Sequence, residues 1–128
     1  KEIKVGDLTP TRDFNYVKDT CRGFLAIAKA KNVAGEEINI ATDTEISMQD
    51  TLNLIAEIMG ADVNWVKDPE RCRPSKSEVF RLHGSNEKIC RMTDWRPQYS
   101  IREGLKQTIE WFTNPENLKK YKSNIYNR

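Results

Sequence analysis

Apolar residues recur at helical spacing in the first third of the chain. One falls at each of the positions i, i+3, i+4 and i+7, namely Cys21, Phe24, Leu25 and Ala28. This spacing predicts a helix over about residues 20–31 whose apolar stripe faces a core. Asp19 precedes the stripe and is the expected N-cap.

Two further helices are predicted where a capping residue precedes an apolar stripe. Ser47 begins the first of them, and Gly60 ends it. Ser100 and Glu103 have the spacing of a capping box, so another helix is expected from there to about Phe112. These caps are local signals that predict where each helix begins.

Short extended segments are expected between the helices. A short helix after Ser85 and a polar helical turn after Pro115 bring the expected helices to four or five. The expected strands lie at about residues 3–5, 11–17, 37–41 and 62–66. The last two flank the helix that begins at Ser47, which predicts a β-α-β unit and an α/β fold.

Composition and charge narrow the class of protein. The chain has 128 residues, 38% hydrophobic and 31% charged, as expected for one soluble globular domain. A net charge of +2 is too small to indicate nucleic acid or an anionic membrane as a partner. The three cysteines are far apart, which favours reduced thiols in a cytoplasmic protein. The sequence begins at Lys1 without a Met, as though in the middle of a strand, so we expect the chain to be a piece of a longer protein.

A charged, irregular segment over residues 72–82 is the first candidate site. Pro74 disfavours a helical backbone at Arg73, and an extended Arg73 can present two parallel N–H groups to a phosphate. Glu78 accepts hydrogen bonds only, which suits a pair of sugar hydroxyls. The segment therefore fits a phosphorylated, hydroxyl-bearing ligand, and a solvated charged loop is the alternative.

Arg12 is the second candidate. In a strand over residues 11–17, alternation places Arg12, Phe14 and Tyr16 on one face. A cation beside two aromatic rings could flank a ligand, or it could be an arginine stacked on a half-buried strand.

The sequence lacks the residues that several kinds of functional site require. The six glycines stand singly, so the sequence contains neither GxGxxG nor a P-loop. It has no HExxH and no cysteine cluster for a metal. His83 is the only histidine, and a nucleophilic pair with Cys72 has nothing to orient it. Without a catalytic constellation, the residues favour binding over turnover.

Three segments together resemble the extended short-chain dehydrogenase/reductases, and among these the sugar-nucleotide 4,6-dehydratases. Residues 6–19 (GDLTPTRDFNYVKD) are similar to the family's "G-[ND]-L-x-x-x-R-D-[FW]…D". Residues 73–88 (RPSKSEVFRLHGSNEK) resemble "RP…EV…L…D-x-S-K". Residues 95–112 (WRPQYSIREGLKQTIEWF) resemble "GW-x-P…[SL]-x-E-G-L-x-x-T-[IV]-x-W".

The resemblance implies that residues 1–128 are the C-terminal, substrate-binding part of an NAD-dependent epimerase/dehydratase. The family's glycine-rich turn for NAD or NADP and its catalytic Tyr-x-x-x-Lys pair do not occur here, so no catalytic residue, cofactor or metal is assigned to this part. By the same resemblance Arg12 and Arg73 would contact the diphosphate of a nucleotide sugar, and Glu78 its ribose. The spacing from Pro74 to Glu78 is longer than in many dehydratases, and residues from Thr113 onward match no motif.

The resemblance leaves rival functions open. A nucleotide-sugar 4-epimerase shares the same segments, and a non-catalytic binding domain remains an alternative of another class. The complete enzyme is expected to be a homo-oligomer that acts as a lyase. Detached from it, the helix over residues 20–31 and the strand over residues 37–41 would leave apolar surface and a strand edge unpaired, so the chain alone is expected to self-associate.

Overall fold

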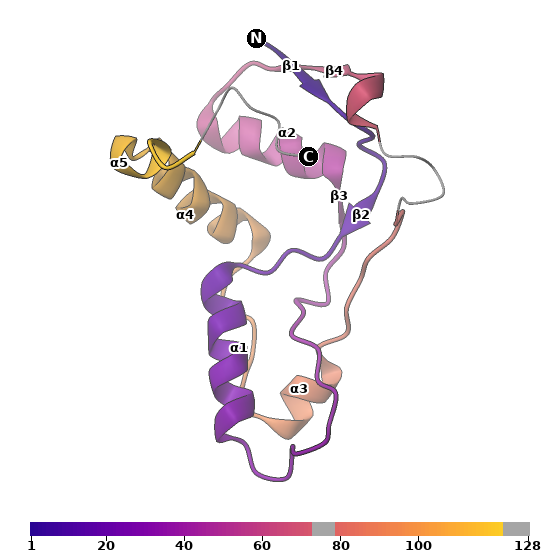
Figure 1. Cartoon of the computed structure of the whole chain (residues 1–128), viewed down its shortest axis with the longest axis vertical. Coiled ribbons are helices and arrows are strands. Elements are labelled where there is room, and N and C mark those ends of the chain that lie inside the picture. Colours follow the sequence, from indigo (N-terminus) through magenta and orange to yellow (C-terminus); the bar gives the residue numbers. More distant parts are fainter. Residues whose placement is uncertain (73–78, 122–128) are drawn as a thin grey trace.

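The structure is a computed structural model that describes residues 1–72 and 79–121. Its elements are β1 (Glu2–Val5), β2 (Thr11–Arg12), α1 (Val17–Lys29), β3 (Ile46–Ser47), α2 (Met48–Met59), β4 (Asn64–Lys67), the 3₁₀ turn η1 (Pro69–Arg71), α3 (Glu87–Met92), α4 (Ile101–Thr113) and α5 (Pro115–Leu118). Helices mixed with short strands confirm the predicted α/β class. In Figure 1, α2 lies beside β1 and β4, with α4 next to it, while α1 and α3 lie at the other end of the molecule.

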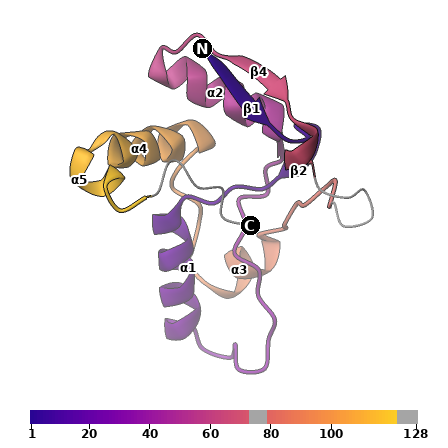
Figure 2. The same cartoon turned by 45° about the horizontal axis from the view of Figure 1, so that its top comes forward.

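A parallel pair of strands, β1 and β4, forms the first sheet. Ile3 is paired with Trp65, and Val5 with Lys67. Figures 1 and 2 both show α2 running alongside this pair, and α2 directly precedes β4 in the chain. The predicted strand at residues 62–66 is therefore confirmed with a shift of two residues at its start. The β-α-β unit was predicted with the wrong first strand, because β4 pairs with β1 and not with residues 37–41.

The second sheet is an antiparallel pair of β2 and β3. Thr11 is paired with Ser47 and Arg12 with Ile46. Of the strand predicted over residues 11–17, only the first two residues are a strand. Residues 13–16 are irregular, and α1 begins at Val17.

Residues 37–41 form no strand, which corrects another expectation. Their neighbours contact them through side chains instead of a backbone ladder: Asn15 Nδ2 donates to Ile40 O at 2.7 Å. Ala41 just beyond is 5% exposed. The described strands pair only as β1 with β4 and β2 with β3. A strand that pairs with residues 37–41 would therefore have to come from outside the described residues.

Helix α1 begins earlier than predicted, and Asp19 is not its N-cap. Tyr16 occupies the cap position without a side-chain hydrogen bond. Asp19 lies in the first turn, fully buried, and its Oδ2 accepts from the backbone N–H groups of Gln98 (3.0 Å) and Tyr99 (3.1 Å). Its other oxygen accepts from Arg22. Asp19 therefore ties α1 to the segment before α4.

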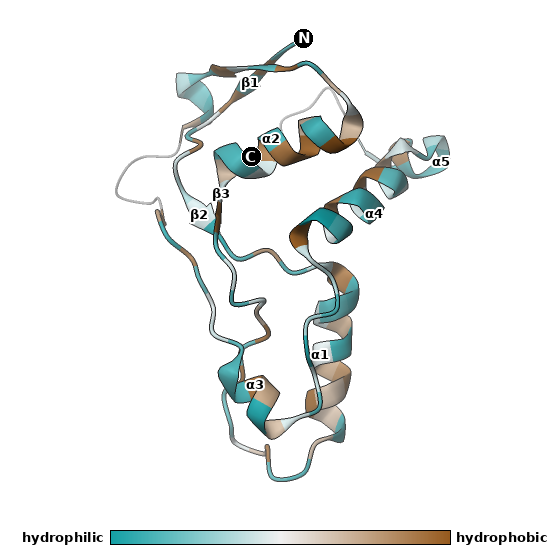
Figure 3. Cartoon of the chain, turned by 180° about the vertical axis from the view of Figure 1, so that it is seen from behind, coloured by the Kyte–Doolittle hydropathy of each residue, from teal (hydrophilic) through white to brown (hydrophobic). Residues whose placement is uncertain are grey.

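The apolar stripe of α1 does not face a core within the described residues. Cys21, Phe24, Leu25 and Ala28 are all exposed, Phe24 to 65% and Leu25 to 58%. The opposite side of the helix is the packed one, because a Cβ on Gly23 would lie 2.8 Å from the Ile40 side chain. Figure 3 shows the apolar residues that recur along α1.

We expect the 128-residue chain on its own to associate through this stripe. Two large apolar side chains side by side on a helix form a patch that water solvates poorly. Light scattering at increasing concentration should report a rising mass, and the double variant Phe24→Ser, Leu25→Glu should reduce it. A wild-type chain that stays monomeric at high concentration would contradict the expectation.

The predicted caps of α2 and α4 are confirmed. Ser47 Oγ accepts from Asp50 N at 2.9 Å, and Gly60 ends α2 in the left-handed region at φ +59°. Ser100 and Glu103 form the full capping box of α4, with Ser100 N donating to Glu103 Oε2 at 2.8 Å. The first turns of both helices are therefore fixed by local side-chain hydrogen bonds. Helix α2 packs against α4.

Candidate functional site

Arg12 lies between two neighbouring chain segments on β2. On one side β3 pairs with it, and on the other side residues 80–82 run next to Thr11. Thr11 N donates to Phe80 O at 2.8 Å, and Leu82 N donates to Thr11 O at 3.1 Å. The Arg12 Nη1 atom donates to Val79 O and Thr11 O, each at 2.7 Å. The guanidinium is therefore anchored where residues 79–82 rejoin the sheet.

The charged segment begins and ends beside residues 6–12. Its start follows η1, where a Cβ on Gly6 would lie 2.5 Å from Arg71 O, so Gly6 lets the two backbones approach closely. In its second half lies Val79, whose carbonyl Arg12 contacts. The predicted ligands Arg73 and Glu78 lie between these two points, outside the described residues. Their assignment stays a prediction.

Glu45 and Arg81 form a bidentate ion pair beside Arg12. Arg81 Nε donates to Glu45 Oε1 (2.8 Å) and Oε2 (2.9 Å), and Arg81 Nη2 lies 2.8 Å from Oε2. Thr11 Oγ1 donates to Glu45 Oε1 as well. Sequence reasoning missed this pair, because 36 residues separate its members and neither belongs to a local pattern.

These contacts hold Glu45 ionised. Hydrogen bonds from Arg81 and then Thr11 lower the pKa of the Glu45 carboxyl from 4.5 to about 2. In turn, the hydrogen bond with Glu45 raises the pKa of Arg81 above its ordinary value. A carboxyl whose pKa is lower in the folded state stabilises it fully above pH 4.5, and the contribution is lost as the pH falls towards 2. Because the Arg81 side chain is 70% exposed, salt screens the pair.

Asp13 joins the end of β2 to two other segments. Its Oδ1 accepts from Thr42 N at 3.0 Å, and its Oδ2 accepts from Asp43 N at 3.1 Å and Gly84 N at 3.4 Å. A Cβ on Gly84 would lie 2.6 Å from the Ala41 Cβ, so this approach requires glycine. The residue after Arg12 thus holds the backbone of residues 42–43 and of Gly84 beside the end of β2.

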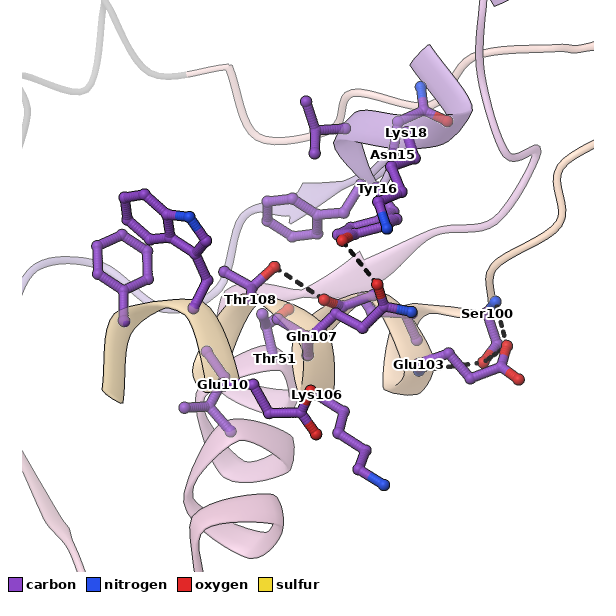
Figure 4. A pocket seen from close by; sticks show the side chains of 18 of the residues that line it. Asn15, Tyr16, Lys18, Thr51, Ser100, Glu103, Lys106, Gln107, Thr108 and Glu110 are labelled. Atoms are coloured by element: carbon purple, nitrogen blue, oxygen red, sulfur yellow. Dashed lines mark hydrogen bonds between the residues drawn. The ribbon is translucent and has the colours of Figure 1, made fainter. Parts of the chain in front are cut away.

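A separate, mostly apolar hollow of about 1350 Å³ lies between α2, α4 and residues 14–18. Figure 4 shows Tyr16 above α4, where its hydroxyl donates to Gln107 Oε1 at 2.9 Å. Phe14 and Tyr16 line this hollow and Arg12 does not. The strand ends at Arg12, so the alternation predicted for these three residues does not continue beyond β2.

Residues 1–72 and 79–121 contain no group of three His, Cys, Asp or Glu side chains that could hold a metal ion. Over the same residues, no helix is long and apolar enough to cross a membrane. His83 is paired with Asp43, its Nε2 lying 3.0 Å from Asp43 Oδ1, and not with Cys72, whose Sγ contacts Asp68 O.

Comparisons with known proteins agree on one family. The model of the GDP-mannose 4,6 dehydratase family matches residues 1–108. A dTDP-D-glucose 4,6-dehydratase from Homo sapiens is 35% identical over 119 residues, covering 88% of this chain and 32% of that protein. An epimerase structure from Methanothermobacter thermautotrophicus has a TM-score of 0.81 at 32% identity, covering 94% of this chain and 35% of its own.

A dehydratase structure is comparably similar. The dTDP-glucose 4,6-dehydratase from Bacillus anthracis in complex with NAD has a TM-score of 0.78 at 26% identity, covering 95% of this chain and 38% of its own. The chain therefore spans about a third of the length of the relatives it matches. Both the fold and the sequence place it among the sugar-nucleotide dehydratases and epimerases, and it belongs to the GDP-mannose 4,6 dehydratase family within the extended short-chain dehydrogenase/reductases.

Proposed function

We propose that this chain is the C-terminal, nucleotide-sugar-binding part of a sugar-nucleotide 4,6-dehydratase. The observation that carries the proposal is the position of Arg12, which the sheet fixes beside Val79 at the end of the segment with Arg73 and Glu78. Two arginines can hold a diphosphate through charge-assisted hydrogen bonds, and a carboxylate can accept from ribose hydroxyls. Binding energy from this non-reacting end of the substrate can orient the sugar.

The nicotinamide cofactor is assigned to another part of the complete protein. Gly6 directly follows β1, but a Cβ there would lie 2.5 Å from Arg71 O, so this glycine serves the close approach of two backbones. The other glycines stand singly, so the described residues do not fit a dinucleotide. The role proposed for this chain is accordingly binding and orientation of the nucleotide sugar.

Arg73→Ala in the complete protein should weaken binding of a nucleotide sugar by roughly 1.5–3 kcal/mol, the scale of a hydrogen bond to a charged group. Titration calorimetry with dTDP-glucose and UDP-glucose measures this directly. Arg91→Ala is the matched control, because Arg91 lies on α3 with a loose contact to Glu87 at 3.9 Å. Equal affinity of wild type and Arg73→Ala would contradict the assignment.

A 4-epimerase is the second candidate, supported by the epimerase structure with a TM-score of 0.81. The product separates the two reactions, since a dehydratase releases a 4-keto-6-deoxy sugar and an epimerase an isomer of the same mass. Mass spectrometry of the product after incubation of the complete protein with each nucleotide sugar distinguishes a loss of water from no change in mass.

A further inference from the structure

We infer that Glu45 is a positioning residue for Arg12: together with Arg81 it holds residues 79–82 against β2, and so sets the carbonyl that orients the Arg12 guanidinium. This inference rests on the proposed function, since it assigns Arg12 to the nucleotide-sugar site. It adds to that site two residues that do not themselves touch the substrate.

One carboxylate contacts both segments that flank Arg12. Glu45 directly precedes β3, and it accepts from the hydroxyl of Thr11, the neighbour of Arg12 on β2. It also accepts from Arg81 through two nitrogens, with distances of 2.8–2.9 Å. The side chain therefore links β2, β3 and residues 79–82 at a single point.

The backbone carries this link to Arg12. Thr11 exchanges two hydrogen bonds with the returning segment, through Phe80 O (2.8 Å) and Leu82 N (3.1 Å). Val79 precedes Phe80, and its carbonyl accepts from Arg12 Nη1 at 2.7 Å. If residues 79–82 shifted away from β2, the acceptor for Arg12 would move with them.

A second side-chain contact joins the same two segments, two residues before Glu45 and two residues after Arg81. His83 Nε2 lies 3.0 Å from Asp43 Oδ1. Loss of Glu45 should therefore loosen the segment without detaching it. An ion pair with a solvent-exposed arginine contributes little to stability by itself, but a bidentate arginine fixes geometry, so the expected effect is on the position of residues 79–82.

The test compares Glu45→Gln with wild type in the complete protein, using dTDP-glucose and UDP-glucose as probes. The variant should raise KM by roughly tenfold, the lower end for one charge-assisted hydrogen bond, and should leave kcat within about twofold. Glu57→Gln is the matched control, because Glu57 also pairs with an arginine, Arg102 at 2.8 Å, away from Arg12. Equal KM values for wild type and Glu45→Gln would overturn the inference.

A double-mutant cycle shows whether the effect passes through Arg12. Once Arg12→Ala has removed the guanidinium, adding Glu45→Gln should change KM by less than about twofold. An undiminished effect of Glu45→Gln in that background would overturn the inference and indicate a merely structural role.

A readout that needs no ligand separates this inference from the proposed function. The Arg12 Nε–Hε resonance should shift in Glu45→Gln and stay in place in Glu57→Gln. A shift in a protein that binds neither probe supports the link to Arg12 while rejecting the proposed ligand. An unchanged resonance in a protein that binds a probe rejects the link and leaves the proposed function standing.

Discussion

Replacing Trp95 with alanine is expected to lower the free energy of unfolding by about 3–5 kcal/mol, the usual cost of truncating a buried tryptophan. Only 2% of its surface is exposed. Its Nε1 atom donates to Asp19 O at 3.0 Å, so the substitution opens a cavity and also removes a buried hydrogen bond. Against a typical total of about 5–15 kcal/mol, such a loss leaves little margin.

Urea denaturation followed by circular dichroism measures this loss, and Trp111→Ala is the matched control. Trp111 is 41% exposed on α4, where it contacts the rings of Phe112 and Tyr121. Its removal should cost clearly less, because water already reaches the ring. Similar losses for the two tryptophans would show that the buried position of Trp95 does not make it more important for stability than an exposed tryptophan.

Asp19→Ala is expected to cost a comparable amount, about 3–5 kcal/mol, because it removes the fully buried member of a part-buried ion pair. The fully buried carboxylate contacts Arg22 and two backbone N–H groups, those of Gln98 and Tyr99. Without it, these donors lose their acceptor and cannot all reach water.

Two further variants test this explanation by the same denaturation experiment. Asp19→Asn keeps the shape and one acceptor oxygen, so it should be less destabilising than Asp19→Ala. Asp94→Ala, at an exposed aspartate one residue before Trp95, should change stability by less than about 0.5 kcal/mol. Equal stabilities of Asp19→Ala and Asp94→Ala would refute the role of Asp19 as a tie between segments.

The parts of the fold that the sequence predicted correctly are those with local causes. Ser47 and Ser100 reach backbone groups three residues away, so the caps of α2 and α4 can be recognised without knowledge of the fold. Gly60 ends α2 for an equally local reason, its positive φ.

The errors concern contacts between distant residues. Asp19 has the sequence position of an N-cap, but its donors are 79 and 80 residues away. The apolar stripe of α1 correctly predicts a helix, yet periodicity does not say which chain covers the stripe. At the site, Arg12 could be singled out as a cation on a strand, whereas Glu45 and Arg81 could not, because only the sheet brings them together.

The pairing of β1 with β4 has a consequence for how the chain is made. Glu2 meets its partner Asn64 only 62 residues later in the sequence. On a ribosome that adds about 5–20 residues per second, β1 must wait roughly 3–12 s for β4 to be synthesised. An unpaired strand is prone to pair with other chains, and charged residues within it discourage this. Glu2 and Lys4 alternate with the two apolar residues of β1, so these charges disfavour pairing with other chains until β4 has been synthesised.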